Sequence, residues 1–309
     1  MNVTLRSAAL VLLAGISYGA TAPIIKLAHG AGFTWQQITA GQSTYGVLLF
    51  LLALAVVRLR GQRWQRLAPR QLLKLLGTGV VTCCTCALYS IALGYLPVAV
   101  ALTLLFQFTW VGVLIQVIAT QRAPSKAEVA SAAIVLVGTL AASGLLSTEL
   151  TIDYHPIGMA CGMGSAVSCA LFMFFTSRVE TDLPTIQRGL VICCGSAILA
   201  YTLCPTYLID GVVLAQAPFG APQGLFALLL PVILFGLGGP HLPTGIVSIL
   251  ASAELPTSIV LSLVMLSEPI DAIQAAGVIT ILVGVVVSQA PTLAELGGQR
   301  KQGGPPQPR

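Results

Sequence analysis

The chain has 309 residues, of which 56% are hydrophobic and only 8% are charged, and its formal net charge is +5. Its mean hydropathy is +0.91. Soluble domains carry about 25% charged residues, so this composition excludes a soluble globular protein. A membrane-spanning helix needs roughly 20 apolar residues, which leaves room for about ten such helices with short connections.

Apolar runs separated by short polar connections predict an all-α integral membrane protein with ten transmembrane helices. The predicted spans are residues 7–27, 36–57, 72–93, 98–119, 128–146, 157–177, 187–207, 224–239, 244–266 and 272–290. The eighth of these spans is the shortest. The last residues, 291–309, are rich in Gly, Pro and Gln, and this composition predicts a disordered cytoplasmic tail.

The basic residues lie in alternate connections between the predicted spans. Every Lys and Arg except Lys26 falls on one side, whereas the other side holds acids such as Glu149 and Asp210. Short cytoplasmic loops carry an excess of Lys and Arg, so we expect both termini in the cytoplasm and a multi-pass protein of the cytoplasmic (inner) membrane. The cluster from Arg58 to Lys74 could instead bind nucleic acid or anionic lipid. Its position between two spans favours a topology anchor, with no nucleic-acid partner.

The first span carries Tyr18, Ala22 and Lys26 at four-residue steps, so these side chains face the same way. Lys26 is the one basic residue of the sequence placed away from the cytoplasmic side. Three roles are open for it: pairing with Glu254, receiving a substrate carboxylate, or snorkelling from the helix end to the interface. Tyr18 shares its face and is therefore a candidate residue of the substrate site.

In the fourth span, Thr103, Gln107 and Trp110 share a helix face. A Gln in hydrocarbon needs a partner, and Trp110 lies too deep for the aromatic belt at the interface. This face predicts a wall toward the substrate, with helix packing as the open alternative. Cys86 and Tyr89 of the third span are weaker candidates, for which packing is the favoured interpretation.

Two stretches of the chain superpose without a gap at an offset of 146 residues (242 − 96). The matching segments are Leu96-Pro97 on Leu242-Pro243 and Leu136-Val137-Gly138 on Leu282-Val283-Gly284. Five predicted spans separate equivalent points, so the second copy crosses the membrane in the opposite sense. The sequence therefore predicts two inverted five-helix repeats, residues 1–146 and 157–290.

The main mismatch inside this repeat sets Glu254 opposite Phe108. An acid near the bilayer centre costs about 2.5–3.5 kcal/mol on insertion scales, so it is retained with a partner or a use. Glu254 is interpreted as a ligand for a substrate ammonium group or as a proton site for coupling, and the structural alternative is a hydrogen bond from a neutral carboxyl to a neighbouring helix. Ser258 and Ser262 follow at helical spacing and predict a polar stripe. Pro256 predicts a freed backbone carbonyl one turn earlier, which is tolerated where it lines a cavity.

Signatures of catalysis, metal binding and cofactor binding do not accompany these polar residues. The 8 cysteines fall inside predicted spans and the 3 histidines are scattered over loops, so we predict no disulfide framework and no metal site. The sequence has neither a Walker loop nor a dinucleotide fingerprint, so no cofactor and no ATP-driven transport are expected. An integral-membrane lipid-modifying enzyme would need paired acids or histidines at the membrane surface. The loops are too short for such a face, so the chain is not expected to be an enzyme.

Three segments carry softer motifs in a defined order. Gly15–Lys26 combines small residues with a Pro and a Lys, Tyr95–Ala101 opens the fourth span, and Ala253–Ser262 is followed by the acidic turn Leu266–Glu268. These segments resemble the first, fourth and ninth helices of the EamA-type branch of the drug/metabolite transporter (DMT) superfamily. The resemblance implies ten helices, a central cavity between the two halves and alternating access. The turn Gln121–Ser125 departs from the family pattern because it lacks the Glu that is often found there.

The resemblance and the sparse polar residues together predict a secondary transporter that exports small amphipathic metabolites, amino acids or related amines. The residues assigned to the substrate or coupling site are Tyr18, Lys26, Thr103, Gln107, Trp110, Glu254, Ser258 and Ser262. Within transporters, the alternative is a carrier of anionic substrates such as nucleotide sugars or sugar phosphates, which would need more buried positive charge than Lys26 offers. The expected partners are a small-molecule substrate, membrane lipids and, where Glu254 couples transport, protons.

Overall fold

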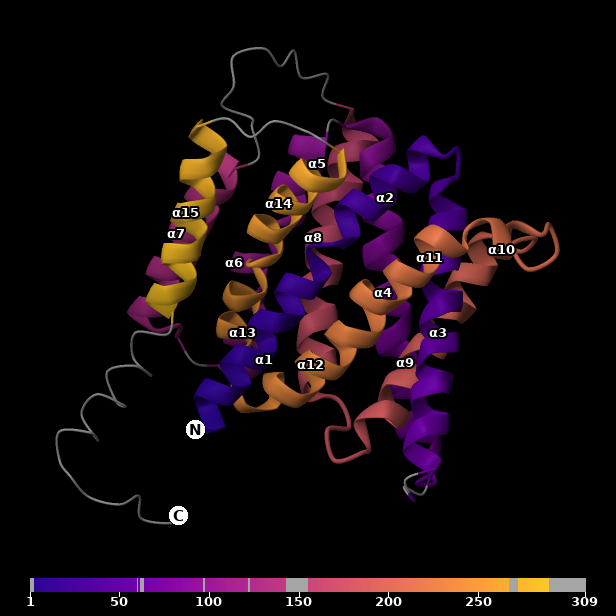
Figure 1. Cartoon of the computed structure of the whole chain (residues 1–309). Helices are drawn as coiled ribbons and strands as arrows, with labels where there is room; N and C mark the ends of the chain where they lie inside the picture. The colour runs from indigo at the N-terminus through magenta and orange to yellow at the C-terminus, as the bar shows by residue number, and fades with distance from the viewer. Residues whose placement is uncertain are drawn as a thin grey trace.

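The computed structural model describes residues 3–59, 61, 64–96, 98–121, 123–142, 155–266 and 272–288. The first half of the chain contains α1 (Val3–Tyr18), α2 (Thr21–Gly30), α3 (Trp35–Leu59), α4 (Pro69–Tyr95), α5 (Val98–Leu105), α6 (Phe108–Thr120) and α7 (Lys126–Ala142). The second half contains α8 (Pro156–Arg178), α9 (Thr185–Leu203), α10 (Val212–Ala215), α11 (Ala217–Gln223), the π-helix η1 (Gly224–Leu229), α12 (Leu230–Gly238), the 3-10 turn η2 (Gly239–His241), α13 (Thr244–Ala251), α14 (Glu254–Leu266) and α15 (Ala272–Ser288). Within these ranges all regular structure is helical (Figure 1). The predicted tail, 291–309, lies outside the described residues.

Among the described residues, 8 helical segments are long and apolar enough to cross a membrane. They coincide with the first four predicted spans and with the sixth to ninth. The fifth and tenth predicted spans coincide with α7, which has 17 residues, and with the shorter apolar segment Ala272–Val287. The predicted length of the eighth span was wrong, because this segment covers Ala217–His241, 25 residues. Pro218 lies at the start of α11, where its missing N–H costs nothing, and the wider η1 turn follows Pro222.

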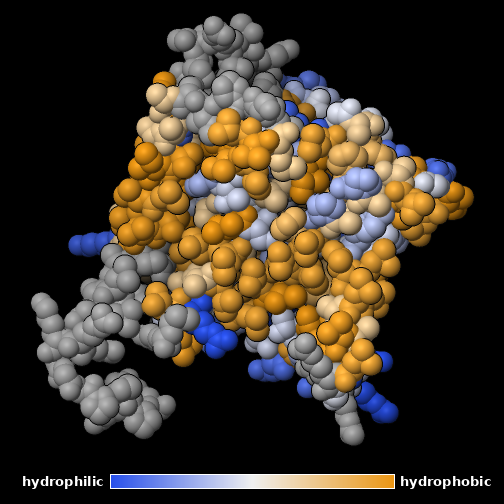
Figure 2. Space-filling view, viewed as in Figure 1, coloured by the Kyte–Doolittle hydropathy of each residue, from blue (hydrophilic) through white to orange (hydrophobic). Residues whose placement is uncertain are grey.

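The outer surface of the helical bundle is apolar around its middle. Large side chains that are mostly exposed include Leu52 (64%), Leu73 (73%), Ile118 (63%) and Val264 (72%). Figure 2 shows that such residues form a broad hydrophobic belt on the face in view. A belt of this extent is a liability in water and matches the surface that a protein presents to lipid tails. The chain is therefore an integral, multi-pass membrane protein.

The two halves of the chain pack on each other through equivalent helix pairs. In the predicted repeat, α1 corresponds to α8, α3 to α9, and α4 to the segment formed by α11, η1 and α12. The contact of α1 with α12 then corresponds to that of α8 with α4. The contact of α4 with α9 corresponds to those of α11 and η1 with α3. Three further pairs, α3–α9, α6–α13 and α7–α15, join a helix of one half to its counterpart in the other. Under the predicted repeat, exchanging the halves therefore converts each of the first contacts into its partner contact and leaves the three further pairs, taken as whole spans, unchanged. The pair α7–α15 lies side by side at one edge of the bundle (Figure 1).

Glycine residues allow several of these helices to approach to backbone contact. A side-chain carbon at Gly79 of α4 would overlap the carbonyl oxygen of Ile192 in α9, and one at Gly195 of α9 would overlap the carbonyl of Leu76. Gly138 of α7 meets α15 in a similar way. Lipid tails are as apolar as the side chains, so close packing through small residues, rather than exclusion from water, drives association of such helices.

A buried acid beside the turn at 121–125 links three helices. Glu128, in the first turn of α7, is 5% exposed. Its Oε2 accepts the Ser125 N–H at 2.7 Å, and its own N–H donates to Ser125 Oγ at 3.2 Å, which forms a capping box. Its Oε1 accepts Gln116 Nε2 at 3.0 Å, and Gln116 Oε1 accepts the Gly245 N–H at 2.6 Å. Glu128 thus ties α6, α7 and α13 together although the turn itself lacks a Glu.

The loop after α8 is held to the start of α4 through Glu180. Gln71 Nε2 donates to Glu180 Oε2 at 2.8 Å, and Lys74 Nζ donates to Oε1 at 3.1 Å. These two hydrogen bonds, first that of Gln71 and then that of Lys74, hold the pKa of the Glu180 carboxyl below its ordinary value. A carboxyl whose pKa is lowered by folding stabilises the fold above its unfolded pKa. That contribution is lost as the pH falls through the lowered value.

We therefore expect Glu180→Gln to lower the thermal midpoint of the solubilised protein slightly at pH 7. The effect is small because the Lys74 side chain is 62% exposed, and water and salt screen the pair. The difference from wild type should close below about pH 4, where the carboxyl takes up a proton. Thermal scanning fluorimetry across pH measures it, with Asp182→Asn, an exposed acid of the same loop, as the control. A difference that widened on acidification would contradict this account.

Candidate functional site

Two helices of the bundle are interrupted at equivalent points. α5 ends before Phe106-Gln107, and α13 ends before Ser252-Ala253, at the repeat offset of 146 residues (252 − 106). At both points backbone N–H groups donate to the carbonyl oxygen three residues earlier, instead of four as in an α-helix. The bonds run from Gln107 to Leu104 (3.1 Å), Thr109 to Phe106 (3.2 Å), Ala253 to Leu250 (3.3 Å) and Leu255 to Ser252 (3.2 Å). The residues that begin the following helices, Phe108 and Glu254, are the mismatched pair of the repeat.

Glu254 brings a buried carboxyl to the interruption of the ninth span. The residue is 4% exposed, and its Oε2 has no hydrogen-bond partner among the described residues. Tyr18 of α1 and Tyr89 of α4 line the same cavity as this carboxyl. As the first residue of α14, the carboxylate also lies where a helix dipole favours negative charge. The site therefore has one buried acid that can accept a cation or a proton.

Pro256 does not leave a free carbonyl at the site, which corrects the sequence prediction. It lies in the first turn of α14, where its missing N–H would have had no helical partner. The carbonyl of Ser252, four residues earlier, accepts the Leu255 N–H at 3.2 Å. The interruption thus satisfies the backbone group that the proline would otherwise have left open.

Two adjoining cavities lie between the helices of the two halves. The central cavity, of about 20 Å³, is lined by Tyr18, Thr21, Ala22, Ile25, Gln42, Thr85, Cys86, Tyr89, Leu105 and Glu254. The distal cavity, of about 140 Å³, is lined by Ala22, Lys26, His29, Tyr89, Leu93, Leu102, Ser258 and Ser262. Because Ala22 and Tyr89 line both, the two cavities adjoin, and we treat them as successive chambers of one candidate path.

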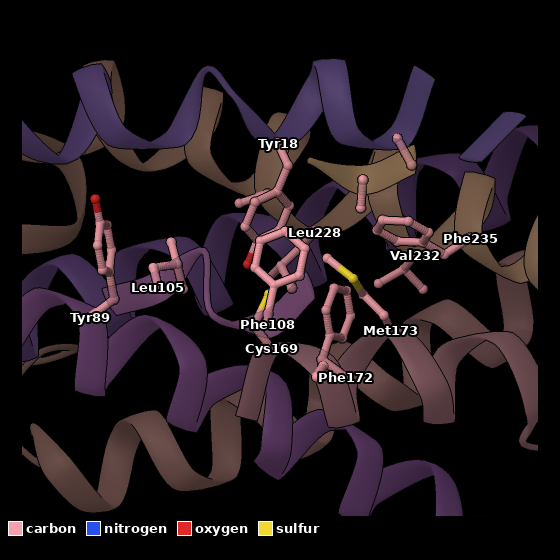
Figure 3. Close-up of a cluster of buried hydrophobic side chains, with 14 of the residues drawn as sticks. Tyr18, Tyr89, Leu105, Phe108, Cys169, Phe172, Met173, Leu228, Val232 and Phe235 are labelled. Atoms are coloured by element: carbon pink, nitrogen blue, oxygen red, sulfur yellow. The ribbon is translucent and has the colours of Figure 1, made fainter. Parts of the chain in front are cut away.

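Apolar side chains close this path beyond Tyr18, toward the end of the bundle at which α1 begins (the Val3 end). The rings of Tyr18 and Phe172 lie 6.2 Å apart, and those of Phe172 and Phe235 lie 6.0 Å apart, edge to face. Phe172 and Phe235 are fully buried. Figure 3 shows Tyr89 at one end of this group of side chains and Phe235 at the other. The cavities are therefore sealed at the Val3 end by packed aromatic rings.

Five of the predicted site residues line these cavities. Glu254 and Tyr18 line the central cavity, and Lys26, Ser258 and Ser262 line the distal one. The predicted polar stripe of the ninth span is thus divided between the two chambers. The acid and the lysine lie in successive chambers of the same path.

The other three predicted residues, Thr103, Gln107 and Trp110, do not line either cavity. Trp110 Nε1 donates to Gln107 Oε1 at 2.8 Å, and Gln107 Nε2 donates to the Thr103 carbonyl at 3.0 Å. Trp110 is 39% exposed on the surface of the bundle. Residues of the same span therefore supply the hydrogen-bond partners that Gln107 needs in hydrocarbon.

Sequence reasoning ranked Cys86 and Tyr89 as packing residues and missed Gln42, yet all three line the central cavity. Gln42 is 1% exposed, and neither its Oε1 nor the Tyr89 hydroxyl has a hydrogen-bond partner within the described ranges. An amide in the middle of the apolar run of α3 was the signal that could have identified Gln42. Within the same ranges, no group of three His, Cys, Asp or Glu residues could hold a metal ion.

A bundle of membrane-spanning helices whose mostly apolar cavities carry a few polar groups, near interrupted helices, is an architecture typical of membrane transport proteins. Residues 5–144 match the model of the EamA-like transporter family. The resemblance seen in the sequence is thereby confirmed. A solved structure, titled only as the crystal structure of a protein, has the same fold, with a TM-score of 0.73 and 20% identity over 92% of this chain and 96% of that chain. No curated protein matches the sequence.

Proposed function

We propose that this protein is a secondary transporter that exports small amphipathic metabolites, amino acids or related amines, by alternating access. In this proposal ten helices form two inverted five-helix repeats, residues 1–146 and 157–290. The exchange of equivalent helix pairs between the halves supports the repeat, as do the two helix interruptions at a common offset. The match of residues 5–144 to the EamA-like transporter family supports the transporter class.

The proposed orientation sets the Val3 end in the cytoplasm of the cell, with the protein in the cytoplasmic (inner) membrane. The described basic residues at the end of α3 and the start of α4, Arg58, Arg70 and Lys74, support it through the positive-inside rule. The aromatic seal then faces the cytoplasm and the distal cavity faces outward. The described conformation would accordingly be an outward-facing one.

The buried carboxyl of Glu254 is the observation that carries the choice of substrate. Taking a carboxylate out of water costs several kcal/mol unless an opposite charge or a proton compensates it. A substrate ammonium group in the central cavity would compensate the charge, and a proton would do so between transport cycles. Lys26, in the distal cavity, offers a cation for the carboxylate of the same solute. An amino acid matches both groups, whereas a sugar phosphate would be repelled by Glu254.

Untargeted metabolite profiling of cells and medium, with and without overexpression, tests this function. We expect amino acids or amines to accumulate in the medium when the wild-type protein is overexpressed. Purified protein in liposomes, offered amino acids, amines or sugar phosphates, then separates the two classes of carrier. Transport of sugar phosphates without transport of amino acids or amines would contradict the proposal.

A further inference from the structure

A buried arginine lies near the Val3 end of the bundle, outside both cavities. Arg188, in the first turn of α9, is 1% exposed. Its Nη1 donates to the Val179 carbonyl at 3.3 Å, but Nε and Nη2 have no hydrogen-bond partner among the described residues. The edge of a guanidinium group that carries Nε–H and Nη2–H is suited to binding a carboxylate through two parallel hydrogen bonds. The open edge of Arg188 therefore has the geometry of an anion site.

Two hydroxyl groups at the end of the preceding helix, α8, are also open. Thr176 Oγ1 and Ser177 Oγ, in the last turn of α8, are buried and have no hydrogen-bond partner in the part of the chain that is described. Arg188 Nη2 packs directly against Gly236, and Ser177 Oγ packs against Gly239 one turn later. Arg188 at the start of α9 and Ser177 at the end of α8 thus both pack on the end of α12 and the start of η2, and Thr176 directly precedes Ser177. We call these three buried side chains with unused donors the Arg188 cluster.

The acids of the neighbouring loop do not neutralise this cluster. Glu180 binds Gln71 and Lys74 of α4, and Asp182 is exposed. Buried polar groups are in general hydrogen-bonded, and buried charges are in general paired. A buried guanidinium with two idle donors is therefore better explained by a partner that arrives than by a role in packing alone.

We propose that the Arg188 cluster is a second binding site, which takes the carboxylate of the transported solute at the cytoplasmic end when that end opens. This inference rests on the proposed function and narrows the substrate class to solutes that carry a carboxylate. One monoanionic carboxylate matches the charge of one guanidinium and its two parallel donors, and the two hydroxyls offer further donors. In the described conformation, the packing of Gly236 on the guanidinium keeps the site closed.

Chemical modification of the wild-type protein tests the site without relying on transport. Phenylglyoxal reacts with accessible guanidinium groups, and mass spectrometry of the peptide that contains Arg188 measures the extent of reaction. We expect the rate at Arg188 to fall about tenfold when acetate is present at about ten times its Kd, as simple occupancy requires. Arg70, exposed at the start of α4, should react at the same rate with and without acetate.

Inorganic phosphate at the same ionic strength forms the second arm of this experiment, because it presents similar acceptor oxygens from another source. Protection by acetate, with weaker or no protection by phosphate, supports a carboxylate site. Protection by phosphate alone would overturn it, as would a failure of acetate to protect. An Arg188 that reacted only after denaturation would also overturn it, because the proposal requires the site to open.

Transport from the cytoplasmic face, measured in inside-out vesicles, tests the role of the site. We expect Arg188→Gln to raise the half-saturation concentration of an amino acid about tenfold or more and to leave that of the decarboxylated amine unchanged. Arg188→Lys should give an intermediate value, because it keeps the charge and loses the two-donor edge. Arg70→Gln is the control for loss of one positive charge. An equal loss for both solutes would mark a folding role and overturn the proposal. Vesicles of the wild type that moved neither solute would count against the proposed function, and the modification experiment would still decide the site.

Discussion

Glu254→Gln is expected to abolish most transport of amines and amino acids while the protein stays folded. The side chain keeps its size, but it can no longer carry a charge or a proton. Removing one partner of a buried ion pair costs about 3–5 kcal/mol, which corresponds to more than about a hundredfold in affinity. The variant should be at least as stable as wild type, because Glu254 Oε2 has no hydrogen-bond partner to lose among the described residues. Uptake into proteoliposomes and the thermal midpoint measure the two effects.

Glu128→Gln is the matched control for this prediction. Both acids are buried, with exposures of 5% for Glu128 and 4% for Glu254, but both carboxyl oxygens of Glu128 accept hydrogen bonds. An amide has one oxygen, so one donor would lose its acceptor at a cost of about 1–3 kcal/mol. The control should lose stability and keep its choice of substrates. A Glu254→Gln variant that transported as well as wild type would remove Glu254 from the mechanism.

Gly79→Val is expected to prevent the bundle from assembling. A side-chain carbon at this position would overlap the backbone of α9 at Ile192 and Ser196, and backbone atoms cannot move aside as a side chain can. Overpacking costs about 1–3 kcal/mol even where side chains yield, and more where they do not. Detergent size-exclusion chromatography of a fluorescent fusion should show loss of the monodisperse peak.

Gly77→Val provides the control from the same helix. Gly77 lies two residues earlier in α4, and a side-chain carbon at this position would meet no heavy atom of another described helix within 4 Å. Both variants introduce the same β-branched residue, so they share its effect on the helix itself. We expect Gly77→Val to remain monodisperse. Similar behaviour of the two variants would show that helix propensity, not the contact with α9, decides the outcome.

The sequence predicted the positions of the helices and singled out Glu254, the acid that lines the central cavity. Apolar runs of sufficient length identify spans in any membrane protein, because the hydrocarbon thickness sets their length. The offset of 146 residues (242 − 96), read from Leu96-Pro97, also relates the two helix interruptions, which were not predicted. Glu254 stood out in the sequence because placing an acid in hydrocarbon costs free energy, so acids inside membrane spans are rare.

The direction in which most side chains face could not be predicted. A helix that is apolar all round has no amphipathic pattern to set its rotation. The sequence therefore favoured Trp110 over Tyr89 as a site residue, whereas Tyr89 lines both cavities and Trp110 is exposed on the surface of the bundle. The face that a helix turns to its neighbours is set by close contacts such as that of Gly79 in α4 with the backbone of α9. These contacts depend on the sequence of the neighbouring helix as well. Gln42 was visible in the sequence, but one amide did not show which helices would meet it.

The shared wall between the two cavities has a consequence for the rate at which different solutes move. Tyr89 and Ala22 line both chambers, so a solute that crosses from one to the other passes beside the phenol ring. We expect a slender solute to need only a rotation of this ring, which is a local motion of one side chain even though Tyr89 is buried. A broad solute has to wait until α2 and α4 move apart, which is a slower, collective motion. We therefore expect the partition to sort solutes by cross-section, in their turnover rates rather than in the strength with which either chamber holds them.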